Sequence, residues 1–282
     1  MRFSQVDVFT DELTLGNPVA VVHDADDLDD AQMAAFARWT NLSETTFLLR
    51  PTDEAADYRV RIFTTHGELP FAGHPTLGSA RAWLEAGGRP RQEGRVVQEC
   101  GVGLVPVRDD GSRLAFAAPP RRRSGPVDEA DVLEVCASLR IEPGDVVDAE
   151  WGDNGPGWLV LLLHDAEAVL ALAPGPFGPL DKVGVVGPYA DGTGPDGVAF
   201  EVRAFFPGGE DPVTGSLNAA IGQWLTGTGR APGRYVASQG TVLRRRGRVH
   251  VERAGDDVWV GGDTVVGVTG EVAVPVGRPD EA

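Results

Sequence analysis

The chain has 282 residues and a formal charge of −17 at pH 7, with 42 acidic residues against 25 lysines and arginines. Nucleic-acid binding depends on clustered positive charge, so this composition argues against a nucleic-acid partner. The length suits one large domain or two domains of ordinary size.

Two further features bear on the cellular compartment. The longest apolar run, WLVLLL at residues 158–163, is far shorter than the roughly 20 residues that a membrane helix needs. The chain has only two cysteines, and its start, MRFSQVDVFT, has no apolar signal segment. These features predict a cytoplasmic protein with reduced thiols and no membrane partner.

Strands and helices are interspersed along the first half of the chain. The predicted elements, in order, are strands at residues 3–9 and 19–23, a helix at 28–39, strands at 45–49 and 58–63, a helix at 74–86, and strands at 95–107 and 112–117. Residues 118–126 are rich in proline, arginine, serine and glycine and are the best linker candidate.

The second half repeats this plan. Its predicted elements are a helix at 128–139, strands at 158–163, 183–186 and 199–205, a helix at 216–225, and strands at 242–246, 248–253, 258–261 and 264–276. Mixed strands around one central helix per half predict an α+β fold. We expect a first domain at residues 1–118 and a second at 119–282, with a last strand that is able to cross back to the first half.

One stretch of sequence occurs twice. Residues 60–73 read VRIFTTHGELPFAG and residues 202–215 read VRAFFPGGEDPVTG, which match at seven of fourteen positions without a gap. Average composition would give roughly one match. The spacing is far longer than the roughly 20–50 residues of a solenoid repeat, so the pattern indicates a duplicated domain.

Each copy leads from a glycine and a polar residue into a helix, at Gly73-His74 and at Gly215-Ser216. Pro75 suits a first helical position, and Ser216 suits an N-cap. If the halves face each other, two helix N-termini with free N–H groups point into one cleft and bind a carboxylate without any lysine or arginine. The alternative is that glycine and serine only cap two helices and that His74 is a capping or buried histidine.

Two carboxylates are further candidates for the site. Glu44 lies at the entry of an apolar strand, in NLSETTFLL, where partial desolvation would raise its pKa toward the range useful for proton transfer. Asp211 stands where the first copy has Leu69. Each has a structural alternative, Glu44 as a solvent-facing residue at a strand end and Asp211 as an anionic helix cap.

Five stretches together resemble the phenazine-biosynthesis (PhzF-like) family, which is related to diaminopimelate epimerase. They are VDVFTDELTLGNPVAVV, NLSETTFLL, ELPFAGHPTLGSA, EDPVTGSLNAAIGQWL and GRVHVERAGDDVWVGGDTVVGVTGEV, and they extend over nearly the whole chain. The resemblance implies two pseudosymmetric halves, each a curled mixed or antiparallel sheet wrapped around a central helix, with the active site between them. It also implies a homodimer.

The resemblance assigns roles residue by residue. The family's catalytic residues fall on Glu44, His74 and Asp211, and its substrate-binding residues fall on Gly73, Gly215 and Ser216. The implied reaction is the isomerisation of a small anionic metabolite, trans-2,3-dihydro-3-hydroxyanthranilate or a similar cyclic amino-acid-like compound of secondary metabolism such as antibiotic biosynthesis. The glutamate moves a proton from one carbon to another, without a cofactor or a metal.

Related epimerases and proline racemases use paired cysteines at their two helix starts. Here those starts read PFAGHP and PVTGSL, without cysteine, which argues against a two-thiol racemase. Two alternatives stay open. One is a non-catalytic small-molecule-binding or scaffold homologue, and the other is an epimerase without thiols, in which His74 or Asp211 is the second base opposite Glu44.

Overall fold

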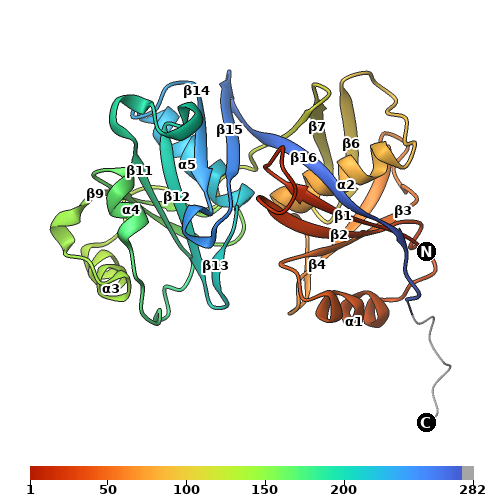
Figure 1. Cartoon of the computed structure of the whole chain (residues 1–282), viewed down its shortest axis with the longest axis horizontal. Helices are drawn as coiled ribbons and strands as arrows, with labels where there is room; N and C mark the ends of the chain where they lie inside the picture. Colours follow the sequence, from red (N-terminus) through yellow and green to blue (C-terminus); the bar gives the residue numbers. More distant parts are fainter. Residues whose placement is uncertain (275–282) are drawn as a thin grey trace, which may run out of the picture. The chain divides into compact units, whose positions relative to one another are not determined.

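The structure, a computed structural model, describes residues 1–274, so the end of the strand predicted at 264–276 lies outside the described residues. The chain forms two compact units, the first from Met1–Phe116 together with the stretch that begins at Gly262, and the second from Ala117–Gly261. In each unit, helices pack against a mixed β-sheet (Figure 1). No helix among residues 1–274 has both the length and the apolar composition needed to cross a membrane.

The first unit carries the duplicated stretch on one strand, one short hairpin and one helix. Its elements are β1 (Arg2–Val8), β2 (Asn17–Val22), α1 (Asp30–Thr40), β3 (Thr45–Leu49), β4 (Tyr58–Phe63), β5 (Glu68–Leu69), α2 (Gly73–Glu85), β6 (Arg95–Cys100), β7 (Gly103–Asp109) and β8 (Arg113–Ala117). β1 is antiparallel to β2, β2 parallel to β3, β3 antiparallel to β4, β4 parallel to β6, and β6 antiparallel to β7.

The second unit repeats these pairings. Its elements are α3 (Glu129–Leu139), β9 (Val146–Gly152), β10 (Trp158–Leu163), α4 (Ala166–Ala171), β11 (Val183–Pro188), β12 (Phe200–Phe206), β13 (Gly209–Asp211), α5 (Gly215–Gly227), β14 (Arg234–Gln239) and β15 (Gly247–Ala254). The last strand, β16 (Asp257–Glu271), begins in the second unit and continues into the first. From β9 to β15 the pairings are again antiparallel, parallel, antiparallel, parallel and antiparallel. This confirms the predicted α+β fold of two pseudosymmetric halves, in which α2 corresponds to α5 and α1 to α4.

Two predictions near the end of the chain are wrong. Residues Thr241–Leu243 form a short 3-10 helix in place of the strand predicted at 242–246. Gly240 and Arg244 on either side have φ values of 91° and 59°, and this left-handed backbone interrupts an extended run. The strands predicted at 258–261 and 264–276 are one continuous strand, β16, which pairs with β15 in the second unit and with β1 in the first.

In each unit a glycine allows the central helix to pack closely on its sheet. This glycine is in the helix in the first unit and in the strand in the second. In the first unit Gly78 of α2 lies against Val8 and Val19, and a Cβ added to it would be 3.1 Å from Val8 Cγ2. In the second unit the helix has Ala220 at the equivalent place and the strand has Gly152, whose added Cβ would be 2.8 Å from Ala220 Cβ. Either arrangement keeps the same close distance between helix and strand.

The matching arginine and glutamate of the repeat form the same bond in both units. Arg61 Nε and Nη2 donate to the two carboxylate oxygens of Glu68, at 2.8 and 2.6 Å. Arg203 does the same to Glu210, at 2.9 and 2.7 Å. These bidentate pairs fix the hairpins β4–β5 and β12–β13, which lead into α2 and α5, so the repeated residues have a structural role.

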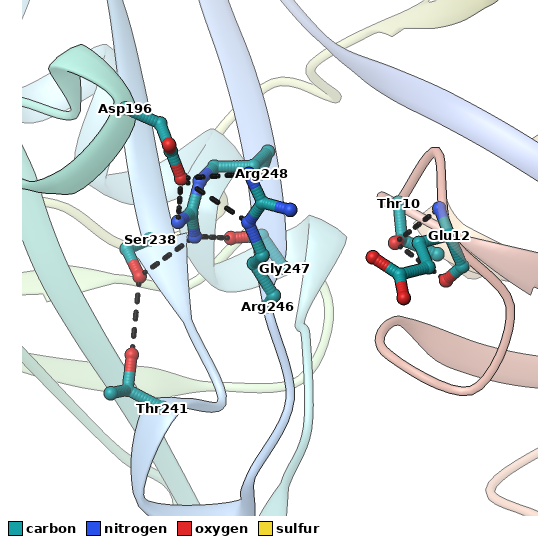
Figure 2. Close-up of polar contacts among 8 residues, drawn as sticks. All are labelled: Thr10, Glu12, Asp196, Ser238, Thr241, Arg246, Gly247 and Arg248. Atoms are coloured by element: carbon teal, nitrogen blue, oxygen red, sulfur yellow. Dashed lines mark hydrogen bonds and ion pairs between the residues drawn. The ribbon is translucent and has the colours of Figure 1, made fainter.

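Some of the arginines in the second unit are engaged with a carboxylate of the same unit (Figure 2). Arg246 Nη2 and Arg248 Nη2 donate to Asp196 Oδ2, at 3.0 and 2.8 Å. Arg248 Nη1 also donates to Ser238 Oγ, which lies 3.2 Å from Thr241 Oγ1. These bonds hold the turn that contains Asp196 against β14 and β15.

Candidate functional site

The start of α2 brings two of the predicted site residues together. Gly73 is the first residue of this helix and His74 the second. His74 Nε2 lies 3.4 Å from Glu44 Oε2, and Glu44 directly precedes β3. The His74 side chain is 5% exposed and the Glu44 side chain 15%, so Glu44 is not the solvent-facing strand-end residue of the structural alternative.

The other ring nitrogen of His74 is also in contact. Asn17, the first residue of β2, is fully buried, and its Nδ2 lies 3.4 Å from His74 Nδ1. Burial lowers the pKa of His74 to about 3, because the charged imidazolium would lose its hydration. His74 is therefore a neutral imidazole near neutral pH, held between an amide and a carboxylate.

Both helices start without a side-chain cap. Ala72 precedes α2 and Thr214 precedes α5, and neither side chain accepts a hydrogen bond from the first turn. The predicted N-cap role of Ser216 is wrong, since Ser216 is the second residue of α5, and Pro75 is the third rather than the first residue of α2. The first-turn N–H groups of both helices thus lack the usual side-chain acceptor.

Ser216 is held by two residues that the sequence analysis did not single out as site residues. Trp158 Nε1 donates to Ser216 Oγ at 3.0 Å, and Asn154 Nδ2 donates to the backbone oxygen of Ser216 at 2.8 Å. Trp158 is the first residue of β10, the strand that corresponds to β2. The polar second residue of each central helix is therefore contacted by the first residue of the equivalent strand.

Asp211 ends β13, four residues before Gly215 begins α5. Its Oδ2 accepts a hydrogen bond of 2.6 Å from the Thr214 hydroxyl, and its backbone oxygen accepts one of 3.1 Å from Gln239 Nε2. The Asp211 carboxylate is thereby fixed beside the start of α5 through the residue that precedes the helix.

A buried glutamine in the sheet forms a hydrogen bond with the first turn of each central helix. Gln98 Nε2 in β6 donates to Thr76 Oγ1 in α2 at 3.0 Å. In the second unit Asn218 Nδ2 in α5 donates to Gln239 Oε1 in β14 at 2.8 Å. Both glutamines are fully buried. Both strands mix polar and apolar residues, so the sequence carries no distinct signal for these contacts.

The predicted residues thus form two groups, one in each unit. Glu44, Gly73 and His74 lie together in the first, and Asp211, Gly215 and Ser216 in the second. The convergence of the two groups on one pocket stays a prediction. Cys100 is in β6 and Cys136 in α3, so neither thiol is at a helix start. Among residues 1–274, no group of three or more His, Cys, Asp or Glu side chains is placed to hold a metal ion.

The two equivalent halves, each with a central helix packed on a mixed sheet, form a diaminopimelate epimerase-like fold. The solved structure of a predicted epimerase from Pseudomonas aeruginosa has this fold, with a TM-score of 0.80 and 28% identity. The similarity covers 96% of this chain and 98% of that one.

The chain belongs to the phenazine biosynthesis-like protein family, whose model matches residues 6–276. Antisense-enhancing sequence 1 of Schizosaccharomyces pombe is 36% identical over 95% of this chain and 97% of its own length. The trans-2,3-dihydro-3-hydroxyanthranilate isomerase of Pseudomonas aeruginosa is 39% identical over 61% of each chain. Together with the family match, the relatives named isomerase and epimerase assign this chain to the isomerases.

Proposed function

We propose that this protein is a cofactor-independent isomerase that moves a proton between two carbons of a small cyclic carboxylate, with Glu44 as the general acid and base. The observation that supports this most directly is the contact of 3.4 Å between Glu44 Oε2 and a buried, neutral His74 at the start of α2. The substrate class is that of trans-2,3-dihydro-3-hydroxyanthranilate, the compound in the name of the P. aeruginosa relative.

Glu44 is suited to proton transfer by its surroundings. It is largely buried but still reachable, since 15% of its side chain is exposed. A general base must carry its proton to a second carbon before water removes it, which a largely enclosed carboxylate allows. Because His74 is neutral with a pKa of about 3, it does not compete with Glu44 for that proton near neutral pH.

The helix starts hold the substrate in this proposal. Gly73 and Gly215 are buried first residues of α2 and α5, and their first turns have no side-chain cap. Backbone N–H groups donate hydrogen bonds to a carboxylate and have no proton that titrates near neutral pH. The Ser216 hydroxyl adds a side-chain donor. The proposal requires that both helix starts contact one substrate, which a structure with bound ligand would test.

Asp211 orients the substrate. Its Oδ2 is fixed by the Thr214 hydroxyl, and a carboxylate oxygen accepts hydrogen bonds only, so it suits an amino or hydroxyl group of the substrate. We further propose a homodimer in the cytoplasm and a role in secondary metabolism. Light scattering at several protein concentrations would test the homodimer.

The test is the isomerisation of trans-2,3-dihydro-3-hydroxyanthranilate by the purified chain. Glu44→Gln keeps the shape and removes the base, so turnover should fall by about 100-fold or more while binding changes little. Ser216→Ala should weaken binding by about 1–2 kcal/mol, the contribution of one hydrogen bond to a charged group.

A second measurement tests the shuttle itself. In deuterated water the wild type should leave partial label at the carbon that receives the proton, since a base that returns the same proton excludes part of the solvent deuterium. Retained turnover in Glu44→Gln would reject Glu44 as the base, and an inactive wild type would reject this substrate class.

A further inference from the structure

The first residues of β2 and β10 contact the same place in the two units. Asn17 contacts His74, and Trp158 contacts Ser216. His74 and Ser216 are each the second residue of a central helix. One contact comes from an amide and the other from an indole. In both, a nitrogen that can only donate a hydrogen bond contacts a side chain that we propose to bind the substrate.

We propose that Asn17 is a positioning residue that fixes the tautomer of His74, with the proton on Nε2. An amide nitrogen has two hydrogens and no lone pair available for a hydrogen bond, so Asn17 Nδ2 donates. His74 Nδ1, 3.4 Å away, must then accept. A neutral imidazole has one N–H, which is consequently on Nε2, the atom 3.4 Å from Glu44 Oε2.

The backbone holds Asn17 at this position. Asn17 pairs with Val8 across β1 and β2, and the N–H of the preceding Gly16 donates to Asp7 Oδ2 at 3.2 Å. A side chain on Gly16 would collide with the backbone oxygen of Val8, so the chain can reach this point only through a glycine. The donor that faces His74 is therefore set by the strand pairing.

The consequence rests on the proposed function. With its proton on Nε2, His74 presents one N–H toward the side of Glu44, where it can donate to a substrate oxygen bound beside that carboxylate. With the proton on Nδ1, the Nε2 lone pair would face the Glu44 carboxylate, and His74 would have no hydrogen to offer on that side. Asn17 thus keeps His74 as a hydrogen-bond donor beside Glu44, the proposed base of the first unit.

NMR of protein labelled with ¹⁵N in its five histidines reads this tautomer without a substrate. His74→Asn identifies the His74 signals by their loss. We expect a protonated-type shift at Nε2, an unprotonated-type shift at Nδ1, and no titration between pH 5 and 8. A proton on Nδ1 in the wild type would overturn the proposal, whatever the variants do.

Asn17→Asp provides the matched change, because a carboxylate of similar shape accepts and cannot donate. It should move the proton to Nδ1 or hold a second proton on the ring, and it should lower kcat by about 10-fold or more with a smaller change in KM. An unchanged tautomer in this variant would overturn the proposal.

If this variant does not fold, Asn17→Ala should give a mixture of tautomers, and a pure Nε2–H form would reject the role. A wild type with the Nε2–H form but no turnover supports the assignment and rejects the proposed reaction.

The bond between Trp158 and Ser216 carries a second inference independently. An indole N–H only donates, so Ser216 Oγ accepts at 3.0 Å and keeps its own hydrogen for another acceptor. The structure assigns Trp158 the role of orienting Ser216 as a donor toward a bound anion. Trp158 is buried, so its ring also packs the core, and the variant must keep the ring.

Trp158→Phe removes the N–H and keeps an aromatic side chain. It should raise the dissociation constant of 3-hydroxyanthranilate, a non-isomerising aromatic analogue, by about 2- to 10-fold. In a Ser216→Ala background the same change should have no further effect, since the bond is already lost. Additive effects of the two changes would show that Trp158 acts by packing alone and would reject the role.

Discussion

Arg61 and Arg203 make the same bidentate bond to a glutamate seven residues later, but they differ in their surroundings. The Arg61 side chain is 20% exposed and also binds Asp30 at the start of α1. The Arg203 side chain is 4% exposed and also donates to the backbone oxygens of Val169 and Leu172 at the end of α4. Both arginines thus bind the glutamate of their own hairpin. Each also binds the outer helix of its unit, Arg61 at the start of α1 and Arg203 at the end of α4.

The position of the proposed base differs more sharply between the units. Thr45 pairs with Phe63 of the repeat, and Val183 pairs with Phe205, so the residues before them correspond. These residues are Glu44 in the first unit and Lys182, the one lysine of the chain, in the second. The scaffold is thus duplicated and the chemistry is not, which supports a mechanism with one base rather than two.

The largest expected effect tests the difference in burial between the two arginines. Arg203→Ala leaves Glu210 and two carbonyl oxygens without their donor in a buried place and should lower the free energy of unfolding by about 3–5 kcal/mol. Arg61→Ala should cost about 1 kcal/mol or less, because its pair is partly in solvent. Urea unfolding of both variants measures this. Equal losses of unfolding free energy in the two variants would show that the burial of Arg203 and its bonds to the end of α4 add no stability.

A pH series tests the burial of His74. The pKa of His74 is lowered to about 3 in the folded state and is about 6.5 in the unfolded chain, so the folded state binds fewer protons between these values. Its contribution to stability is complete above about pH 6.5 and is lost as the pH falls. Relative to His74→Asn, the wild type should lose about 2 kcal/mol between pH 7.5 and pH 5.

The control for this series is His66→Asn, since His66 is exposed on the surface of the same unit. That variant should follow the wild type over the whole range. A parallel course of the wild type and His74→Asn would instead mean that His74 is hydrated in the folded protein.

The exchanged glycines predict a smaller effect. Gly78→Ala should cost about 1–2 kcal/mol, because the methyl group would overlap Val19 and approach Val8, which outweighs the gain in helix propensity of about 1 kcal/mol. Adding Val8→Gly copies the arrangement of the second unit. The loss of stability caused by Val8→Gly should be smaller in the Gly78→Ala background than in the wild type. Thermal unfolding of the wild type, the two single variants and the double variant measures the difference. Strictly additive losses would show that the two positions do not compensate each other.

The smallest effect concerns Lys182. Lys182→Ala should change turnover of the isomerase substrate by less than about 2-fold, since this exposed residue is the counterpart of Glu44 by position only. A loss comparable to that of Glu44→Gln would show that the second unit supplies a catalytic group at the equivalent place.

Much of this arrangement could be predicted from local sequence. The repeat indicated two halves, and the helix predicted at residues 28–39 is α1, whose N-cap Asp29 accepts a hydrogen bond from the Gln32 N–H. β9, α4 and β14 were missed, because α4 has only six residues and the two strands mix polar and apolar residues without regular alternation.

The partners of the candidate site residues were beyond local reasoning. Asn17 and Trp158 contact residues 57 and 58 positions away, and nothing in the flanking sequence names the other member. The N-cap of α5 was also predicted two residues too late. Serine is a residue type that often caps helices, but the residue at the N-cap position is Thr214. Pattern therefore predicted which segments carry the site, and tertiary packing decided which atoms face one another.

β16 has a consequence for synthesis on the ribosome. This strand ends beside the chain's beginning, with Glu271 opposite Arg2. When the first 116 residues have emerged, β1 is paired with β2 on one side and has an open edge on the other until β16 is made. An open edge is a template for pairing with another chain, and contacts between distant residues form slowly. The nascent first unit must therefore remain incomplete while the whole second unit is translated, and truncation within β16 should release a chain prone to aggregation.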